Sequence, residues 1–364
     1  MTLVLAMLAF VAPPQNETLP IEKTAKDKSE EVNLKLRTSA DVFLSSPAYS
    51  FDTQFTALIL QPTGSNLSYA AEAIPLPLPS PDWKIQNVKP EYHFGFDLLF
   101  EGIFHTLYST ATLDWQHFHS SDSNSKTTST SNMIGPFFEI GPDASPYKKA
   151  LGRAVFHFDA VNLNYGVFVN FGKRLRTNLF GGIGFARIHQ TLHQIFSDLT
   201  GTIVRRIETP STFMGFGPEL GLSFGYCVMS NFRLTGETSI SLLVGNLKDH
   251  TRFQTSSAAL APLGITPPNR QSTKEQKRTQ FVPGFEGRLG FSYSMVFRKH
   301  YYFKLEAGYQ AQIYLNAIQS TDMGSEVNTP PISPNTVGVY ARTFHRTQSN
   351  FALAGPYANL SLGF

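Results

Sequence analysis

Twelve charged residues stand on the polar phase of stretches in which every second position is apolar or aromatic. The acids are Asp52, Glu91, Asp97, Asp114, Glu219, Glu237, Glu286 and Glu306, and the bases are Arg176, Arg233, Arg288 and Lys304. Successive side chains of a β-strand point to opposite faces, so these residues would share one face. Rings of charge select ions where such a face lines water, and the excess of acids predicts a mild preference for cations.

The same charges could instead neutralise one another, because charges in a narrow interior must be paired or solvated. The residues of this kind on four consecutive candidate strands are Glu219, Arg233, Glu237, Glu286, Arg288, Lys304 and Glu306. We expect any single one of them to be paired, with Lys304 and Glu306 partnered by Arg288 and Glu286. We still predict that the twelve residues together carry a net negative charge.

Histidines offer a second chemistry, and the candidates are His117, His119, His157, His189, His193 and His250. His157 lies two residues from Asp159, and pairing of this kind can activate a nucleophile. The chain has no G-x-S-x-G or H-E-x-x-H motif, and its one cysteine, Cys227, forms neither an internal disulfide nor a cysteine metal site. We therefore expect no enzyme activity, no cofactor and no metal, with the histidines as ordinary rim residues.

The stretch from Tyr301 to Ala317 shows most clearly which elements would position these groups. Its odd positions are all apolar or aromatic, and its even positions are polar, glycine or tyrosine. Typical strands of globular proteins have about 5 or 6 residues, whereas a tilted strand needs about 9–11 to cross a bilayer. The stretch therefore predicts one long strand with an apolar face and a wet face.

The same alternation recurs along the chain and predicts ten strands. They centre on residues 51–59, 91–100, 106–116, 161–170, 175–185, 216–226, 232–244, 281–295, 301–317 and 358–364. The connections alternate between short turns near 101–103, 171–174, 229–231 and 298–300 and long loops near 62–87, 119–150, 252–278 and 318–346, with a hairpin near 197–202. Short turns at one end and long loops at the other are typical of an outer-membrane barrel.

The predicted fold is therefore all-β, a transmembrane antiparallel barrel of about ten strands with short periplasmic turns and long extracellular loops. Closure removes the open edges that lipid would leave unsatisfied. A further strand pair from residues 31–50 would make twelve. The alternative is a β-sandwich, which would show shorter strands and balanced loops.

Composition and the chain ends agree with this prediction. Charged residues make up 16% of the 364 residues, against about 25% in soluble domains. The net charge of +3 is too small to indicate a nucleic-acid partner. Residues 1–14 are similar to a signal peptide, residues 15–45 form a polar periplasmic leader, and residues 46–364 form the barrel. The final strand, with Leu360, Leu362 and a terminal Phe364, resembles the recognition pattern of the bacterial barrel-assembly machinery.

Four stretches resemble the Legionella-type major outer membrane protein family. They are LDWQHFHSSDSNS (113–125), FHFDAVNLNYGVFVN with LRTNLFGGIGFARIHQ (156–190), FMGFGPELGLSFGY with SLLVGNLK (213–248), and FVPGFEGRLGFSYS with YYFKLEAGYQAQIYLNAIQ (281–319). The first strand departs from the family, with FTALILQP in place of a tryptophan-containing pattern. The resemblance implies a pore-forming barrel of the bacterial outer membrane.

The expected function is passive diffusion of ions and small solutes through a mildly cation-favouring lumen. The expected partners are outer-membrane lipid, the barrel-assembly machinery, and ions and small solutes, while a homo-oligomer is left open. Two other functions also stay open. One is a surface adhesin or antigen that uses the long loops. The other is a barrel enzyme of the protease or lipase type.

Overall fold

The computed structural model describes residues 49–363, except positions 65, 75–81, 129–132, 136–146, 173, 230, 257–268, 275–276, 298–300 and 328–338. The predicted signal segment (1–14), the leader (15–45) and Phe364 lie outside the described residues. So does most of the segment 31–50, which was considered for a further strand pair. Within the described part, no helix is long and apolar enough to span a membrane.

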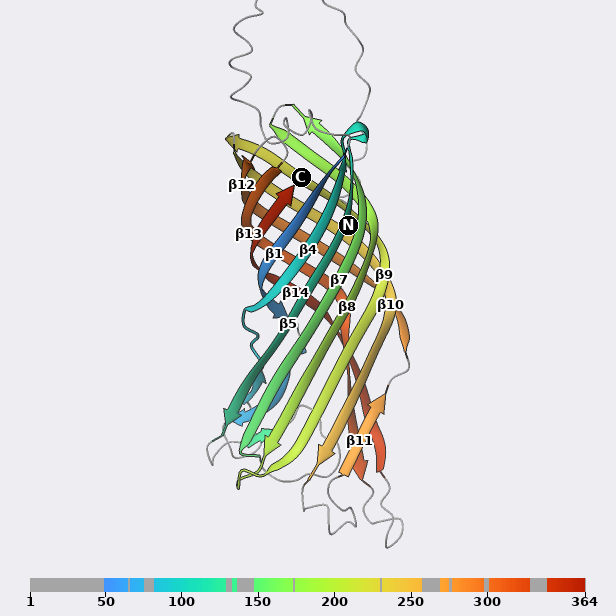
Figure 1. Ribbon diagram of the computed structural model, residues 1–364. Helices are drawn as coiled ribbons and strands as arrows, with labels where there is room; N and C mark the ends of the chain where they lie inside the picture. The colour runs from blue at the N-terminus through green and yellow to red at the C-terminus, as the bar shows by residue number, and fades with distance from the viewer. Residues whose placement is uncertain are drawn as a thin grey trace, which may run out of the picture.

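Ten antiparallel strands form a closed ring (Figure 1). They are β1 (Tyr49–Thr63), β4 (His93–Phe104), β5 (Ser109–Thr127), β7 (Lys149–Phe171), β8 (Leu175–Ser197), β9 (Ile203–Met229), β10 (Phe232–Thr255), β12 (Arg278–Phe297), β13 (Tyr301–Val327) and β14 (Val339–Gly363). The ring closes because β1 pairs with β14 on one side and β4 on the other. This confirms the predicted barrel of ten strands and rules out the sandwich.

The predicted alternation is visible as an apolar outer surface. Leu163, Ile183 and Phe216 are each at least 60% exposed, while their sequence neighbours Asn164, Gly184 and Gly217 are buried. Apolar side chains at the same phase of every ring strand make a continuous exposed belt. A soluble monomer does not carry an apolar surface of that extent, whereas a lipid-facing belt is the rule for a membrane barrel.

The strands run further than the sequence pattern predicted. Both β9 and β13 have 27 residues, well beyond the roughly 9–11 that cross a bilayer. Much of the predicted loop sequence is strand: β5 continues to Thr127, β10 to Thr255 and β13 to Val327. A short strand, β11 (Asn269–Lys274), adds to β10 near the bottom of Figure 1. The wall therefore projects far past the belt at the end of the long connections, called the long-loop end here.

The opposite end carries the short turns. A 3₁₀ turn, η1 (His105–Leu107), joins β4 to β5, and Gly172, in the β7–β8 turn, has a φ of 65°. The predicted hairpin near 197–202 is present at the long-loop end. There the Thr200 hydroxyl donates to the Asp198 carboxylate and lowers its pKa below the usual value, which keeps the turn negatively charged.

The alternation in β13 breaks at Asn316, contrary to the prediction for Tyr301–Ala317. Asn316 has a φ of 57°, and the register with β14 shifts between Tyr314 and Ile318. This is a β-bulge, which inserts a residue and changes the phase of the strand. Ala317, predicted on the lipid face, is 1% exposed. Beyond the bulge, Gln319 and Thr321 both donate to Asp249 of β10, so this part of β13 leans over the interior face of the wall.

The connection between β1 and β4 also folds into the barrel at the long-loop end. It contains β2 (Ser68–Ile74) and β3 (Asp82–Asn87), and β2 also pairs with β6 (Met133–Gly135). Its contacts are with inward-facing residues of the ring. Gln190 donates to Asn66 at 2.9 Å, and Lys126 lies 3.4 Å from Glu72. These strands are called the inner sheet here.

Gly152 of β7 provides the space for the inner sheet, because a Cβ at this position would overlap the ring of the fully buried Tyr69. We expect Gly152→Val to displace the sheet. A cysteine placed at Val88, which is 2% exposed, should then react with a polar maleimide at least about tenfold faster. Gly225→Val is the matched control, because a Cβ there meets nothing within 4 Å. Equal labelling rates in the two variants would show that the inner sheet does not depend on this contact.

Candidate functional site

Charged side chains fill the half of the barrel interior nearer the short turns, called the charged layer here. Arg288 of β12 is its centre. Its guanidinium lies 2.8 Å from the Asp97 carboxylate and 2.9 Å from the Glu286 carboxylate. Asp97 stands on β4, and three strands separate β4 from β12 around the ring. The Arg288–Asp97 ion pair therefore spans the interior rather than following the wall.

Two further predicted carboxylates lie beside this pair. Asp114 of β5 lies within hydrogen-bonding reach of Asp97 and accepts a hydrogen bond from Asn162 at 3.5 Å. Glu237 of β10 is the direct cross-strand neighbour of Arg288. On the next strand, Glu219 is 6% exposed and accepts a hydrogen bond from Asn164 at 3.3 Å. Carboxyl groups thus surround one guanidinium.

Lys304 and Glu306 pair with each other along β13 at 2.8 Å. The prediction that they would be partnered by Arg288 and Glu286 is therefore wrong. Tyr357 of β14 donates to Glu306 at 2.8 Å. The tyrosine occupies the space opposite the glycine pair Gly290–Gly308, where a Cβ on Gly290 would lie 2.6 Å from its hydroxyl. Gly290 accordingly gives room to an aromatic side chain.

The layer continues to the short-turn end. Tyr302 donates to the buried Asp52, and the Arg176 guanidinium lies 3.7 Å from the centre of the Phe168 ring. Arg233 is half-buried on the inward phase of β10. Glu91 was predicted here wrongly, because it lies exposed before β4 begins.

Glu101 takes the place of Glu91, on the same phase of β4 as Asp97. Sequence reasoning missed it because the alternation was ended at Phe100. The same alternation, continued past Phe100, places Glu101 on the inward face. The count of eight acids and four bases is unchanged by this exchange.

An aromatic layer lies above the charged layer, toward the long-loop end. Phe156 and Phe158 of β7 reach Phe351 of β14 with ring centroids 6.1 Å and 5.6 Å apart, and Phe158 reaches Tyr314 of β13 at 5.6 Å. Three strands separate β7 from β14 around the ring, so these contacts cross the interior. Phe156, Phe158 and Phe351 are fully buried. The aromatic layer therefore fills part of the interior at this level.

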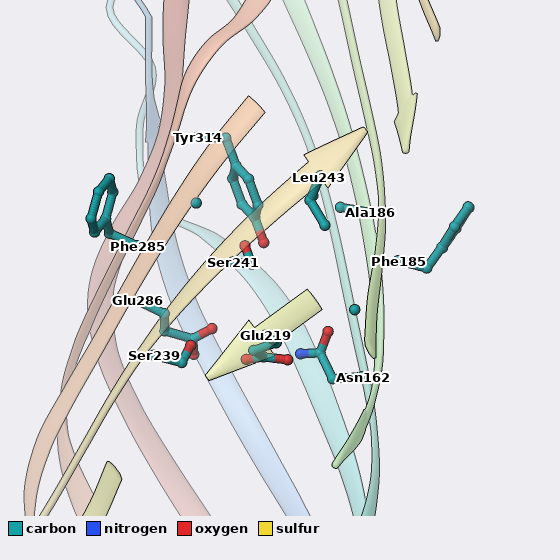
Figure 2. A pocket seen from close by; sticks show the side chains of 12 residues that line it. Asn162, Phe185, Ala186, Glu219, Ser239, Ser241, Leu243, Phe285, Glu286 and Tyr314 are labelled. Carbon is teal, nitrogen blue, oxygen red and sulfur yellow. The ribbon is translucent and has the colours of Figure 1, made fainter. Parts of the chain in front are cut away.

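A small pocket lies where the two layers meet (Figure 2). Glu219, Glu286, Asn162 and the Tyr314 hydroxyl point into it, while Phe285 points away. Its volume is about 10 Å³, which is close to the size that holds one water molecule. Polar groups on several sides would give that water its hydrogen bonds.

The predicted rim histidines face outward. His117 pairs with Asp159 at 2.7 Å, so Asp159 is not the partner of His157. His157 instead lies 3.1 Å from His119. His189 and His193, four residues apart, are separated along the strand by about 14 Å. Among the described residues, no three histidine, cysteine or acidic side chains are placed to hold a metal ion.

The final strand carries the predicted assembly residues. Leu360 and Leu362 lie on the outward phase of β14, and Leu362 is 52% exposed. Their strand forms the seam with β1, where Leu360 pairs with Phe55 and Leu362 with Thr53. Phe364 lies outside the described residues, so the structure places only the first two of the three.

Comparison with known proteins identifies the chain's relatives. The sequence profile of the Legionella pneumophila major outer membrane protein precursor matches residues 44–364, which include all ten ring strands. The chain belongs to the Legionella major outer membrane protein family. As a member of this family and a closed barrel with a lipid-facing belt, it is a protein of the bacterial outer membrane. No curated protein matches the chain.

Several solved outer-membrane barrels are similar to this family member. The outer membrane protease OmpT from Escherichia coli has 11% identity and a TM-score of 0.41, over 88% of this chain and 99% of that one. The translocator domain of the autotransporter NalP from Neisseria meningitidis has 11% identity and a TM-score of 0.30, over 92% and 95%. The Ralstonia pickettii toluene transporter TbuX has 10% identity and a TM-score of 0.28, over 90% and 92%.

Proposed function

We propose that this outer-membrane barrel is a pore of low conductance for small cations, with the aromatic layer as its constriction. The observation that carries the proposal is the charged layer, in which eight carboxyl groups face four basic groups inside the barrel. Burying unpaired carboxylates costs several kcal/mol each unless water or cations solvate them. A barrel that served only as an anchor would be filled more favourably by neutral side chains.

The size of the ring favours a narrow passage. About eight strands give an interior just filled by side chains, and 16–18 leave an aqueous channel. In this ten-stranded ring the Arg288–Asp97 ion pair crosses the interior at one level and the Phe158–Phe351 contact crosses it at another. Phenylalanine and tyrosine can change rotamer without breaking an ion pair. The aromatic layer is therefore the part that would move when the pore conducts.

Currents in planar bilayers test the proposal directly. The refolded protein is expected to give small, discrete current steps in KCl, well below those of a 16-stranded general porin refolded in parallel. A barrel refolded from the Glu219→Gln/Glu286→Gln variant should show a weaker cation preference. Steps as large as those of the porin, or no current from protein shown to be inserted, would contradict the proposal.

Passive conduction needs no covalent chemistry, and we propose that the protein is not an enzyme. The His117–Asp159 pair lies on the outer wall next to the apolar belt, away from the interior. Substitution of His117 by glutamine should therefore leave the pore currents unchanged. Protease or lipase turnover by the purified protein that is lost in this variant would establish the enzyme alternative.

A second candidate function is binding of a partner at the cell surface. The observation that favours it is the length of the wall past the belt, since β5, β7, β8, β9 and β10 all continue as strands there. Such a wall would hold the connecting segments clear of the membrane. Loss of cell or sugar binding after shortening the β8–β9 hairpin, with the currents unchanged, would support this adhesin role.

A further inference from the structure

One flank of the barrel changes from apolar to charged just past the lipid-facing belt. On β5, β7, β8 and β9 the apolar stretch includes a row of outward cross-strand neighbours, Trp115, Val161, Phe185 and Phe216. The next outward row toward the long-loop end consists of His117, Asp159, Arg187 and Met214. Rows of outward residues are about 7 Å apart along a strand. Aromatic residues mark the edge of the hydrocarbon region, so this flank meets the headgroup zone at these rows.

Three imidazoles form the second row past the belt, called the histidine row here. His119, His157 and His189 are cross-strand neighbours on β5, β7 and β8. The rings of His119 and His157 stack with centroids 4.2 Å apart, and those of His157 and His189 lie 5.7 Å apart.

The row is held in place and flanked by permanent charge. His189 is held from both sides by the hydroxyls of Thr212, at 2.8 Å, and Thr191, at 3.0 Å. Lys248 of β10, exposed, extends the row past Thr212. Arg187, also exposed, stands one row nearer the belt.

The flank is positively charged overall. Its exposed outward bases are Lys149, Arg153, Arg187, Arg206, Lys248 and Arg252, and its outward acids are Asp159 and Glu208. Glu208 is paired with Arg252 at 3.5 Å. The opposite flank differs, because the first polar outward residues past the apolar stretch on β1 and β14 are Gln61 and Asn350, which are uncharged.

We propose that this flank binds the phosphate groups of outer-leaflet lipid headgroups, with Arg187, Lys248 and the histidine row as the contact surface. A phosphate seated over His189 and Thr212 would lie between Arg187, one row nearer the belt on the same strand as His189, and Lys248, two strands away. The occupant is a lipid rather than free phosphate, because the bases stand directly past the belt that holds the acyl chains. Arginine and lysine are suited to phosphate, and each contributes measurably to binding of an anionic headgroup.

Protonation of the imidazoles adds a dependence on pH. The charged and titratable groups that face the row are His117 on β5, Arg153 and Asp159 on β7, Arg187 and His193 on β8, Glu208 on β9, and Lys248, His250 and Arg252 on β10. Burial lowers the pKa of His157 and His189 below the usual value of about 6.5, and the neighbouring His119 and Arg187 lower it further, so these imidazoles gain their charge only on acidification below that value. Acidification should therefore tighten the hold on phosphate, and removal of the three imidazoles should remove that part of the response.

The test uses the full-length protein in phosphatidylcholine bicelles with a lipid A-type disaccharide that carries phosphate monoesters. Its dephosphorylated form serves as the comparison, and retained lipid is measured by native mass spectrometry and by titration. Wild type should prefer the phosphorylated form. Arg187→Gln/Lys248→Gln should weaken its binding by about fivefold per charge removed. His119→Gln/His157→Gln/His189→Gln should bind the phosphorylated lipid as wild type does at about pH 7.5 and more weakly than wild type at about pH 5, where the comparison at one pH cancels the titration of the phosphate itself.

Arg206→Gln is the matched control. Arg206 is an exposed outward arginine on the same flank, but it lies about 20 Å further along β9 than Thr212. Its loss should leave lipid binding unchanged. Equal binding of the dephosphorylated lipid, or a loss in Arg206→Gln as large as in the double variant, would overturn the proposal. Displacement of the lipid by inorganic phosphate at equal concentration would overturn the assignment to a headgroup.

Discussion

Replacing Arg288 with methionine is expected to lower the free energy of unfolding by about 3–5 kcal/mol. The substitution leaves Asp97, which is 1% exposed, without its cation, and Glu286 loses the same partner. Removing one partner of a buried ion pair costs more than removing both, because the remaining charge stays desolvated. Urea unfolding of the protein in lipid vesicles, followed by its β-sheet circular dichroism, measures the loss.

Two variants make this result specific to the interior ion pair. Arg252→Met removes an exposed arginine that pairs with Glu208 at 3.5 Å, and its effect should stay within about 1 kcal/mol. Asp97→Asn combined with Arg288→Met should recover part of the stability lost in the single variant. If Arg288→Met unfolds at the same urea concentration as wild type, the ion pair does not hold the charged layer together.

Replacing both Phe158 and Phe351 with alanine is expected to raise the single-channel conductance several-fold. Their ring centroids lie 5.6 Å apart across the interior, and both side chains are fully buried. Their removal opens the aromatic layer toward the pocket beside Glu219 and Tyr314. Each large-to-small change in a packed site also costs about 3–5 kcal/mol. Conductance is therefore recorded only from protein that retains the β-sheet circular dichroism of wild type.

Phe216→Ala is the control for this variant. Phe216 is 67% exposed on the outer surface, so the substitution removes one phenylalanine ring from the lipid side and should leave the conductance unchanged. Phe158→Trp offers an opposite change, since the larger ring should reduce the current further. An unchanged conductance in the double alanine variant would show that the constriction lies elsewhere.

The membrane-spanning part of the fold could be predicted because lipid and the interior impose opposite demands on successive residues. In Tyr301–Leu315 the alternation is complete, and the strand is where it was expected. Past the belt both faces of a strand can be polar, so the pattern disappears. The stretch 119–127, HSSDSNSKT, was therefore predicted as a loop, although it is the end of β5. The bulge at Asn316 left no sign in the alternation either.

The members of the charged layer were largely predictable, and their partners were not. The alternation along each strand was enough to place Asp97 and Arg288 on the inward face, because the direction of a side chain depends only on its position in its own strand. Their ion pair depends on the width of the ring and on which strands stand opposite each other. The aromatic layer was missed for a related reason. Phe156 and Phe158 occupy the polar phase of their strand, and only the closed ring brings Phe351 against them.

The reversal potential of the Phe158→Ala/Phe351→Ala pore in a KCl gradient tests most directly whether the interior conducts through an acidic layer. With eight carboxyl groups against four bases in the charged layer, we expect a reversal potential of the sign that reports preferential passage of K⁺. The preference should weaken in Glu219→Gln/Glu286→Gln on the same background. A reversal potential at zero or of the opposite sign would contradict the account.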